Sequence, residues 1–191
     1  MKLLLVVDMQ NDFITGSLGT EEARAIVSAV AEKIARSRGG LILFTKDTHG
    51  ADYLETQEGK NLPVGHCADG SEGWMIHDDI LAAWRGNKDT VTDPDLSDNV
   101  LQKNTFGSKE LIKYIETLKK SDKELDEIEI IGLCTDICVI SNALLIKAFE
   151  PELKISVDAA CCAGVTPESH EIALKAMKMC QINIINQKGP A

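Results

Sequence analysis

The chain has few aromatic residues, a deficit of positive charge and no long apolar run. Phe, Trp and Tyr make up 4% of its 191 residues, and 30 acidic side chains against 20 basic ones give a formal net charge of −10. So acidic a chain is poorly suited to nucleic acid or an anionic membrane, and we expect neither as a partner. The first apolar run, residues 3–7, ends at Asp8 and is too short for a signal sequence or a membrane span, so we expect a cytoplasmic protein.

The six cysteines do not suggest the disulfide framework of a small secreted domain. They stand at positions 67, 134, 138, 161, 162 and 180, and in a reducing compartment each is expected to be a free thiol with a structural, catalytic or metal-binding role. No linker or low-complexity tract divides the chain. We therefore expect a single domain over residues 1–191.

Apolar runs of strand length alternate with amphipathic helical patterns along the chain. We predict strands near residues 3–7, 41–45, 100–103, 128–131, 153–157 and 182–185, with helices between them. This order predicts an α/β fold, a three-layer doubly wound sandwich around a mainly parallel six-stranded sheet. The polar segment 46–73 is long for a connection in so compact a chain, and it predicts a binding loop.

Three reactive side chains follow predicted strands, at the edge where a doubly wound sheet binds its ligands. Asp8 follows the first strand, Lys103 ends the third, and Cys138 stands where the fourth strand passes into a helix. The positive end of a helix and a nearby lysine favour a thiolate, so Cys138 is a candidate nucleophile. Asp8 could take the thiol proton and return it to a leaving amine, while Lys103 keeps both groups charged. Taken singly, a turn aspartate, a solvated lysine and a buried thiol would be ordinary, but together they predict catalysis.

Three segments together resemble the signature blocks of the isochorismatase-like cysteine hydrolases, and most closely those of the nicotinamidase branch. They are Asp8–Phe13, Lys103–Phe106 and Gly132–Val139. The resemblance spans nearly the whole chain in the right order. It implies that the three reactive side chains form a catalytic triad, which makes an acyl-thioester with a small-molecule amide and releases the acid with water. It also implies a homo-oligomer, without fixing the number of subunits.

The same resemblance implies an oxyanion hole next to the nucleophile. Family members have a cis peptide bond at the position of Leu133-Cys134 in this chain. The backbone N–H groups of Cys134 and Cys138 would then point at the oxyanion that develops during the reaction. Cys134 would contribute its backbone to this site and would not be a second nucleophile.

A metal site is predicted near the second strand. Asp47 and His49 follow that strand, and His66 lies further along the polar segment. Carboxylate and imidazole groups are suitable ligands for first-row metals. The resemblance supports this site, because nicotinamidases have an Asp-x-His pair here and a further histidine before a cysteine, as in His66-Cys67. It implies a divalent metal, zinc in the first place and iron or manganese otherwise, with open positions for water and the pyridine nitrogen of the substrate.

The substrate pocket departs from the typical nicotinamidase pattern. Phe13 is expected to form one apolar wall, and Phe106 or Trp74 another. Tyr53 stands where these enzymes commonly have a further histidine, and Pro63 stands where an aromatic wall for the pyridine ring is common. Amide hydrolysis is therefore predicted more firmly than nicotinamide as the substrate.

Three alternatives stay open at this point. An N-carbamoyl or ureido amidohydrolase would keep the whole triad and change only the pocket. An isochorismatase would share Asp8 and Lys103 but would need no thiol. A non-catalytic metal or thiol-redox module would pair Cys134 with Cys138, although a disulfide at this spacing would be strained if Cys134 lies outside the helix.

Two further histidines receive no role from the sequence. His77 is followed by two aspartates and is expected at a solvated helix position. His170 follows Thr166-Pro167, which is expected to open the last helix, and is predicted to be exposed or to cap that helix.

Overall fold

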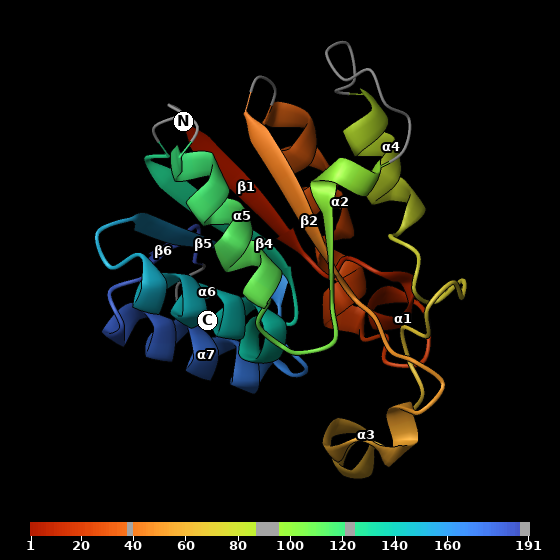
Figure 1. The fold of residues 1–191 in the computed structure, drawn as a ribbon. Helices are drawn as coiled ribbons and strands as arrows, with labels where there is room; N and C mark the ends of the chain where they lie inside the picture. Colours follow the sequence, from red (N-terminus) through yellow and green to blue (C-terminus); the bar gives the residue numbers. More distant parts are fainter. Residues whose placement is uncertain (38–39, 87–95, 121–124, 188–191) are drawn as a thin grey trace.

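The structure is a computed structural model that describes residues 1–37, 40–86, 96–120 and 125–187. In these residues six strands form one sheet in the order β3-β2-β1-β4-β5-β6, and every neighbouring pair is parallel (Figure 1). The predicted α/β fold is confirmed. The strands are β1 (Lys2–Val7), β2 (Leu41–Asp47), β3 (Val100–Lys103), β4 (Glu127–Leu133), β5 (Lys154–Ala163) and β6 (Asn183–Ile185).

Helices cover both faces of the sheet. α1, α2 and α4 pack on one face, whereas α5, α6 and α7 cover the other (Figure 1). None of the described helices is both long and apolar enough to cross a membrane. The helices are α1 (Asn11–Ile14), α2 (Glu21–Arg36), α3 (Gln57–Asn61), α4 (Asp78–Gly86), α5 (Lys109–Lys120), α6 (Ile140–Phe149) and α7 (Pro167–Met179), with the short turns η1 (Tyr53–Glu55), η2 (Leu96–Asn99) and η3 (Thr135–Val139).

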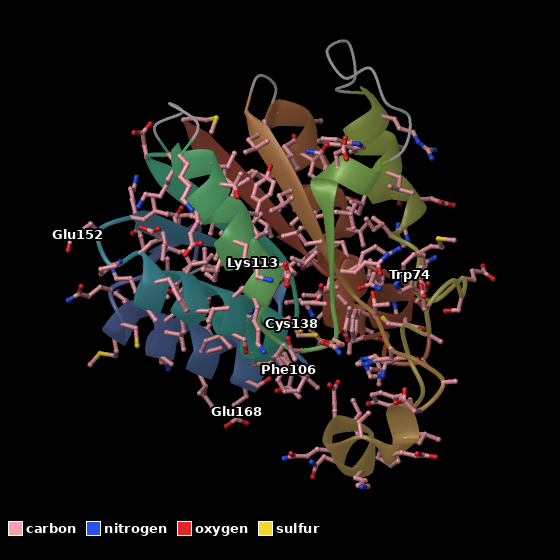
Figure 2. The ribbon with its side chains drawn as sticks, in the orientation of Figure 1. Trp74, Phe106, Lys113, Cys138, Glu152 and Glu168 are labelled. Atoms are coloured by element: carbon pink, nitrogen blue, oxygen red, sulfur yellow. The ribbon has the colours of Figure 1, made fainter. Side chains whose placement is uncertain are left out.

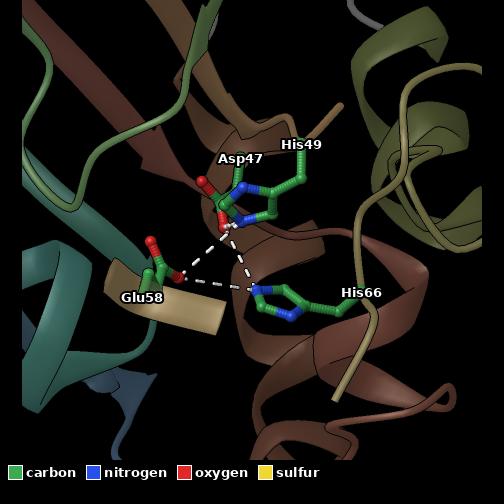
Figure 3. A group of neighbouring side chains, drawn as sticks. All are labelled: Asp47, His49, Glu58 and His66. Carbon is green, nitrogen blue, oxygen red and sulfur yellow. Dashed lines mark hydrogen bonds and ion pairs between the residues drawn. The ribbon is translucent and has the colours of Figure 1, made fainter. Parts of the chain in front are cut away.

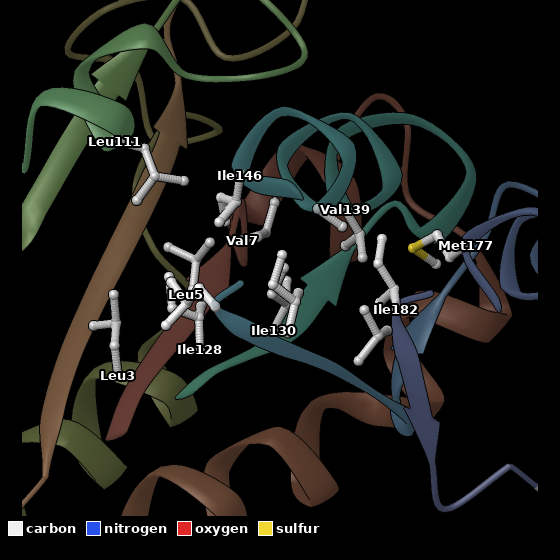
Figure 4. Close-up of a cluster of buried hydrophobic side chains, with 14 of the residues drawn as sticks. Leu3, Leu5, Val7, Leu111, Ile128, Ile130, Val139, Ile146, Met177 and Ile182 are labelled. Carbon is white, nitrogen blue, oxygen red and sulfur yellow. The ribbon is translucent and has the colours of Figure 1, made fainter. Parts of the chain in front are cut away.

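Alternate residues of β1 enter two separate apolar layers. Leu3, Leu5 and Val7 pack with α5, α6 and α7, and Figure 4 shows them among the buried side chains of that layer. Leu4 and Val6 pack with α2 and α4 on the opposite face. Because successive side chains of a strand point to opposite faces, a strand covered on both sides must be apolar throughout. This explains the continuous apolar run at the start of the chain.

Two elements differ from the sequence-based expectation. The fifth strand was expected over residues 153–157, but β5 continues to Ala163, with Cys162 in register with Gly132 of β4. The polar segment 46–73 is not a plain loop, because it contains η1 and α3. In Figure 1, α3 stands away from the two helix layers that cover the sheet.

The strand order reverses at β1, and this reversal positions the site. The chain runs from β1 outward to β2 and β3 and then returns to β4 on the other side of β1. Ligands of doubly wound sheets bind at the carboxyl ends of the strands beside such a reversal. Gly132 allows β4 to approach β1 here, because it has a φ of +116° and a Cβ at this position would clash with the carbonyl oxygen of Val7.

Candidate active site

Asp8, Lys103 and Cys138 meet at the carboxyl edge of the sheet. Asp8 directly follows β1, Lys103 ends β3, and Cys138 lies in η3, a π-helical turn after β4. The Nζ of Lys103 lies 2.6 Å from Oδ2 of Asp8 and 3.5 Å from Sγ of Cys138. All three side chains are buried. The structure thus brings the three residues of the expected triad into one cluster.

Burial shifts the pKa values of the thiol and of the carboxyl group in this cluster. Burial raises the pKa of the Cys138 thiol well above its usual range, Asp8 raises it further, and Lys103 opposes both effects. Burial also raises the pKa of Asp8, against the opposing effect of Lys103. Removal of the sulfur from water beside a carboxylate thus works against the thiolate that the helix end and Lys103 were expected to favour.

Lys103 keeps its charge despite its burial. Burial alone would disfavour the ammonium, but Asp8, Cys138 and Asp47 outweigh that effect and raise the pKa of Lys103. Its Nζ is also 3.4 Å from Oδ1 of Asp47. The expected role of Lys103 as the cation of the cluster therefore agrees with its surroundings.

A threonine from β2 holds the Asp8 carboxylate. Thr45 donates from Oγ1 to Oδ1 of Asp8 over 2.7 Å, and its carbonyl accepts the backbone N–H of Asp8 at 3.2 Å. Asp8 has a φ of 46°, a left-handed conformation that aspartate tolerates better than most residues. Thr45 was not predicted as part of the site, although a polar residue in an apolar strand run is a usable signal.

The turn η3 connects β4 to α6 and carries the thiol. The peptide bond between Leu133 and Cys134 is cis, as the resemblance implied. The carbonyl of Cys134 accepts hydrogen bonds from the N–H groups of Ile137 and Val139 at 3.1 and 3.0 Å. Cys134 and Cys138 are separate free thiols.

His170 supports η3 from α7. Its Nδ1 lies 2.8 Å from Oγ1 of Thr135, the buried first residue of the turn. Burial lowers the pKa of His170, so its ring is neutral at pH 7 and can accept this hydrogen bond. The expectation of an exposed or capping histidine was wrong, because the partner lies on a distant segment that the sequence does not place beside it.

The three predicted metal ligands converge, and Glu58 joins them (Figure 3). One ligand atom from each of Asp47, His49, Glu58 and His66 lies within 4.8 Å of the others. Oδ2 of Asp47 is 3.0 and 3.5 Å from the Nε2 atoms of His49 and His66. Oε1 of Glu58 is 3.7 and 3.8 Å from the same nitrogens. Two imidazoles and two carboxylates in a largely buried group suit a first-row divalent metal.

Glu58 is a candidate ligand that no sequence pattern singles out. It lies on α3, which Thr56 begins by accepting the N–H of Gly59 at 3.0 Å. Tyr53 stands where nicotinamidases commonly have a further histidine. Its ring packs against His49, and its hydroxyl donates to the carbonyl of Leu62 at 2.9 Å. The fourth candidate ligand is thus a carboxylate from the short helix, while the tyrosine packs beside the group.

Two contacts fix the orientation of the metal-ligand group. Gln10 accepts the backbone N–H of Asp47 at 2.7 Å and donates to its carbonyl at 2.8 Å. Nδ1 of His66 lies 2.9 Å from the carbonyl of Val64, which leaves Nε2 free to face the other ligands. The Nζ of Lys103 lies 3.4 Å from Oδ1 of Asp47 and 3.5 Å from Sγ of Cys138. The sulfur and this carboxylate oxygen are therefore at most about 7 Å apart.

A cavity of about 620 Å³ opens over both groups. Its lining includes Cys138 and three of the candidate metal ligands, Asp47, Glu58 and His66. No lysine or arginine is among the lining residues, all of which belong to the described part of the chain. The apolar lining residues are Phe13, Leu18, Leu62, Phe106, Ile137 and Val165.

The two phenylalanines expected in the pocket both line this cavity, but Trp74 does not. The ring of Trp74 lies under Lys46, with Nζ 2.7 Å from its centre, and its Nε1 donates to Thr48 at 2.8 Å. Figure 2 shows Trp74 well apart from Cys138 and Phe106. Trp74 thus packs against the end of β2 and the residue that follows it.

Comparison with known proteins identifies relatives along almost the full chain. The model of the isochorismatase domain family matches residues 2–188. A nicotinamidase of Escherichia coli (strain K12) is 28% identical over 201 residues, which cover 93% of this chain and 90% of that protein.

Three solved structures show the same fold. A nicotinamidase/pyrazinamidase from Bacillus subtilis has a TM-score of 0.79 at 25% identity and covers 96% of this chain and 98% of its own. The pyrazinamidase of Pyrococcus horikoshii in complex with zinc has a TM-score of 0.75 at 24% identity, with 97% and 99% covered. An N-carbamoylsarcosine amidase from Thermoplasma acidophilum has a TM-score of 0.70 at 24% identity, with 98% and 99% covered.

Proposed function

The chain belongs to the isochorismatase family, and from this membership we propose that it is a nicotinamidase-like amidohydrolase with Cys138 as its nucleophile. Like its nicotinamidase relatives, it is a hydrolase of a non-peptide C–N bond. One observation carries the proposed cysteine mechanism. The ammonium of Lys103 lies 3.5 Å from Sγ of Cys138 and 2.6 Å from Asp8 inside a buried cluster.

Asp8 is the proposed proton carrier of the reaction. Sγ of Cys138 bonds to the carbonyl carbon of the amide while its proton passes to the Asp8 carboxylate. Asp8 then protonates the amide nitrogen, the C–N bond breaks, and ammonia leaves an acyl-thioester. Water attacks the thioester as it gives a proton to Asp8. The acid is released when the C–S bond breaks and the sulfur takes that proton back.

Lys103 and η3 would stabilise the charges that develop. A thiol with a raised pKa needs a base within reach, and the Lys103 ammonium keeps a buried Asp8 carboxylate available for that role. The backbone N–H groups of Cys134 and Cys138 are the proposed donors to the oxyanion. His170 would keep the turn in place through Thr135.

Asp47, His49, Glu58 and His66 would hold a divalent metal, with zinc as first choice and iron or manganese as alternatives. The zinc in the related pyrazinamidase supports this choice. When bound, the metal would orient the substrate by coordinating a heteroatom such as the pyridine nitrogen of nicotinamide. The short span from Asp47 to Cys138 through Lys103 allows one small ring to reach both groups.

A second candidate is an N-carbamoyl amidohydrolase, which the similarity to N-carbamoylsarcosine amidase favours. Substrates of that enzyme class carry a carboxylate, which proteins commonly bind with a basic side chain. The described residues that line this cavity include no lysine or arginine, whereas they do include the carboxyl groups of Asp47 and Glu58. We therefore favour an uncharged amide, and the same argument disfavours isochorismate, which is a dicarboxylate.

The test of this function is ammonia release by the zinc-loaded protein from nicotinamide, pyrazinamide and an N-carbamoyl amino acid. The proposal predicts turnover of the two heteroaromatic amides. Turnover confined to the N-carbamoyl compound would transfer the assignment to the second candidate. No turnover of any of the three would contradict both.

We also propose that the protein acts in the cytoplasm as a homo-oligomer and has neither nucleic acid nor membrane as a partner. The net charge of −10 supports the exclusion of polyanions. Exposed apolar side chains on α7, Ile172 and Met179, support self-association. Light scattering in solution tests the assembly, because a mass equal to one chain would contradict it.

A further inference from the structure

The cavity over the catalytic cluster is larger than a single-ring amide requires. Its volume of about 620 Å³ lies within the range of sites that enclose drug-sized ligands. Nicotinamide is one ring with one carboxamide. Placed between Cys138 and the metal-ligand group, it would leave much of the apolar wall in contact with water.

The apolar lining residues of the cavity, called the apolar wall here, lie beside both Cys138 and the candidate metal ligands. Phe106 and Cys138 are linked through Asn142, whose Nδ2 donates to both of their carbonyls, at 3.2 and 2.8 Å. Val165 is tied to η3, because its N–H donates to the carboxylate of Asp136. Leu62 directly follows α3, the helix that carries Glu58.

Three members of this wall are unusually exposed for their type. Leu62 is 37%, Phe106 46% and Val165 48% exposed. Single apolar side chains at a surface need no explanation, but apolar groups gathered around one opening indicate a ligand site. They come from separate segments of the chain, so their convergence at the cavity is a property of the fold.

We propose that the natural substrate is an uncharged heteroaromatic carboxamide that carries an apolar substituent, which Leu62, Phe106 and Val165 contact. This inference rests on the proposed function. On a pyridine ring the substituent belongs at the 5-position. A group beside the ring nitrogen would crowd the metal ligands, and a group beside the carboxamide would crowd Cys138.

The first experiment compares kcat/KM of the zinc-loaded protein for nicotinamide and its 5-methyl, 5-ethyl and 5-propyl derivatives. Each methylene that becomes buried should raise kcat/KM about fourfold. A carboxylate at the 5-position should lower kcat/KM, because the cavity lining offers acidic and not basic side chains. A flat or falling alkyl series, with nicotinamide itself turned over, would overturn the inference and leave the proposed function intact.

A matched pair of variants locates the contact. Leu62→Ser should reduce the ratio of kcat/KM for 5-propylnicotinamide to that for nicotinamide, because Leu62 lines the cavity. Leu54→Ser is the control, since Leu54 belongs to the neighbouring turn η1, is 59% exposed and is not a lining residue. An unchanged ratio in Leu62→Ser, or an equal change in both variants, would contradict the proposed contact.

Binding separates failure of the inference from failure of the proposed function. Calorimetry with the zinc-loaded Cys138→Ala variant gives Kd for the same four amides without any turnover. If none is hydrolysed by the wild type, the proposed function fails, but a Kd that falls along the alkyl series still supports the apolar subsite. Equal or weaker binding of the alkylated amides overturns the subsite whatever the turnover.

Discussion

The Nζ of Lys103 lies 3.5 Å from Sγ of Cys138, inside a cluster that also contains two carboxylates. The same ammonium is 2.6 Å from Asp8 and 3.4 Å from Asp47. One buried cation therefore joins the proposed nucleophile, the proposed base and a candidate metal ligand. A buried carboxylate is tolerated only when it has a partner, so we expect Lys103 to stabilise the fold around these carboxylates as well as the proposed amide hydrolysis.

Lys103→Met should destabilise the fold and abolish turnover. Removal of one partner of a buried ion pair costs about 3–5 kcal/mol, and here two carboxylates lose a partner. Urea unfolding measures this loss in the free energy of unfolding. Lys113→Met is the control, because Lys113 is an exposed residue paired with Glu110 on the same helix, and its effect should stay within about 0.5 kcal/mol. Equal stability of the two variants would contradict the structural role of Lys103.

The pH dependence of turnover should report the raised pKa of Asp8. The carboxyl group must be ionised to accept the thiol proton, so kcat/KM falls as the pH falls through this pKa. Because burial raises the pKa, the acid limb should lie above the ordinary value of 3.8. A profile of kcat/KM for nicotinamide against pH measures it. An acid limb at or below the ordinary value would contradict the assignment of Asp8 as the base.

Glu58→Gln should weaken metal binding while the fold persists. The variant removes one charged ligand of the four-residue group, and we expect a loss of affinity of about tenfold or more. The difference in zinc affinity is measured as the zinc that each protein retains against a competing chelator, by mass spectrometry. Glu55→Gln is the matched control, since Glu55 is exposed and lies outside the group. Equal zinc retention in the two variants would remove Glu58 from the site.

His170 and Thr135 should behave as a coupled pair. His170→Ala leaves the buried Thr135 hydroxyl without its partner, which costs about 1–3 kcal/mol. The double variant His170→Ala with Thr135→Val should lose less free energy of unfolding than the sum of the losses in the two single variants. Because η3 carries Cys138, His170→Ala should also lower kcat more than it changes KM. Additive stability losses in urea unfolding, with unchanged kcat, would contradict this role.

Local sequence patterns predicted the fold and the place of the three residues of the proposed triad. A buried parallel strand must be apolar on both faces, so apolar runs identify β1 and β4. Asp8 directly follows β1, and Cys138 lies in the turn η3 that follows β4. Lys103 was found in the same way at the end of β3. A doubly wound sheet brings these ends together, so the sequence was sufficient for this part of the site.

Features that depend on distant contacts could not be predicted. Glu58 resembles the neighbouring acidic residues until α3 turns it toward His49 and His66. The raised pKa of Cys138 depends on its burial beside Asp8, which no local pattern reports. His170 finds its partner only when α7 packs against η3.

The most direct test of the central claim is to follow nicotinamide turnover in wild type and in Cys138→Ala, with the intact protein mass measured in rapidly quenched samples. We expect ammonia release by the wild type and a nicotinoyl group bound at Cys138 in the quenched protein. The folded variant should lose roughly a thousandfold or more of the rate. Full turnover by Cys138→Ala, or an acyl group on a different cysteine, would show that Cys138 is not the nucleophile.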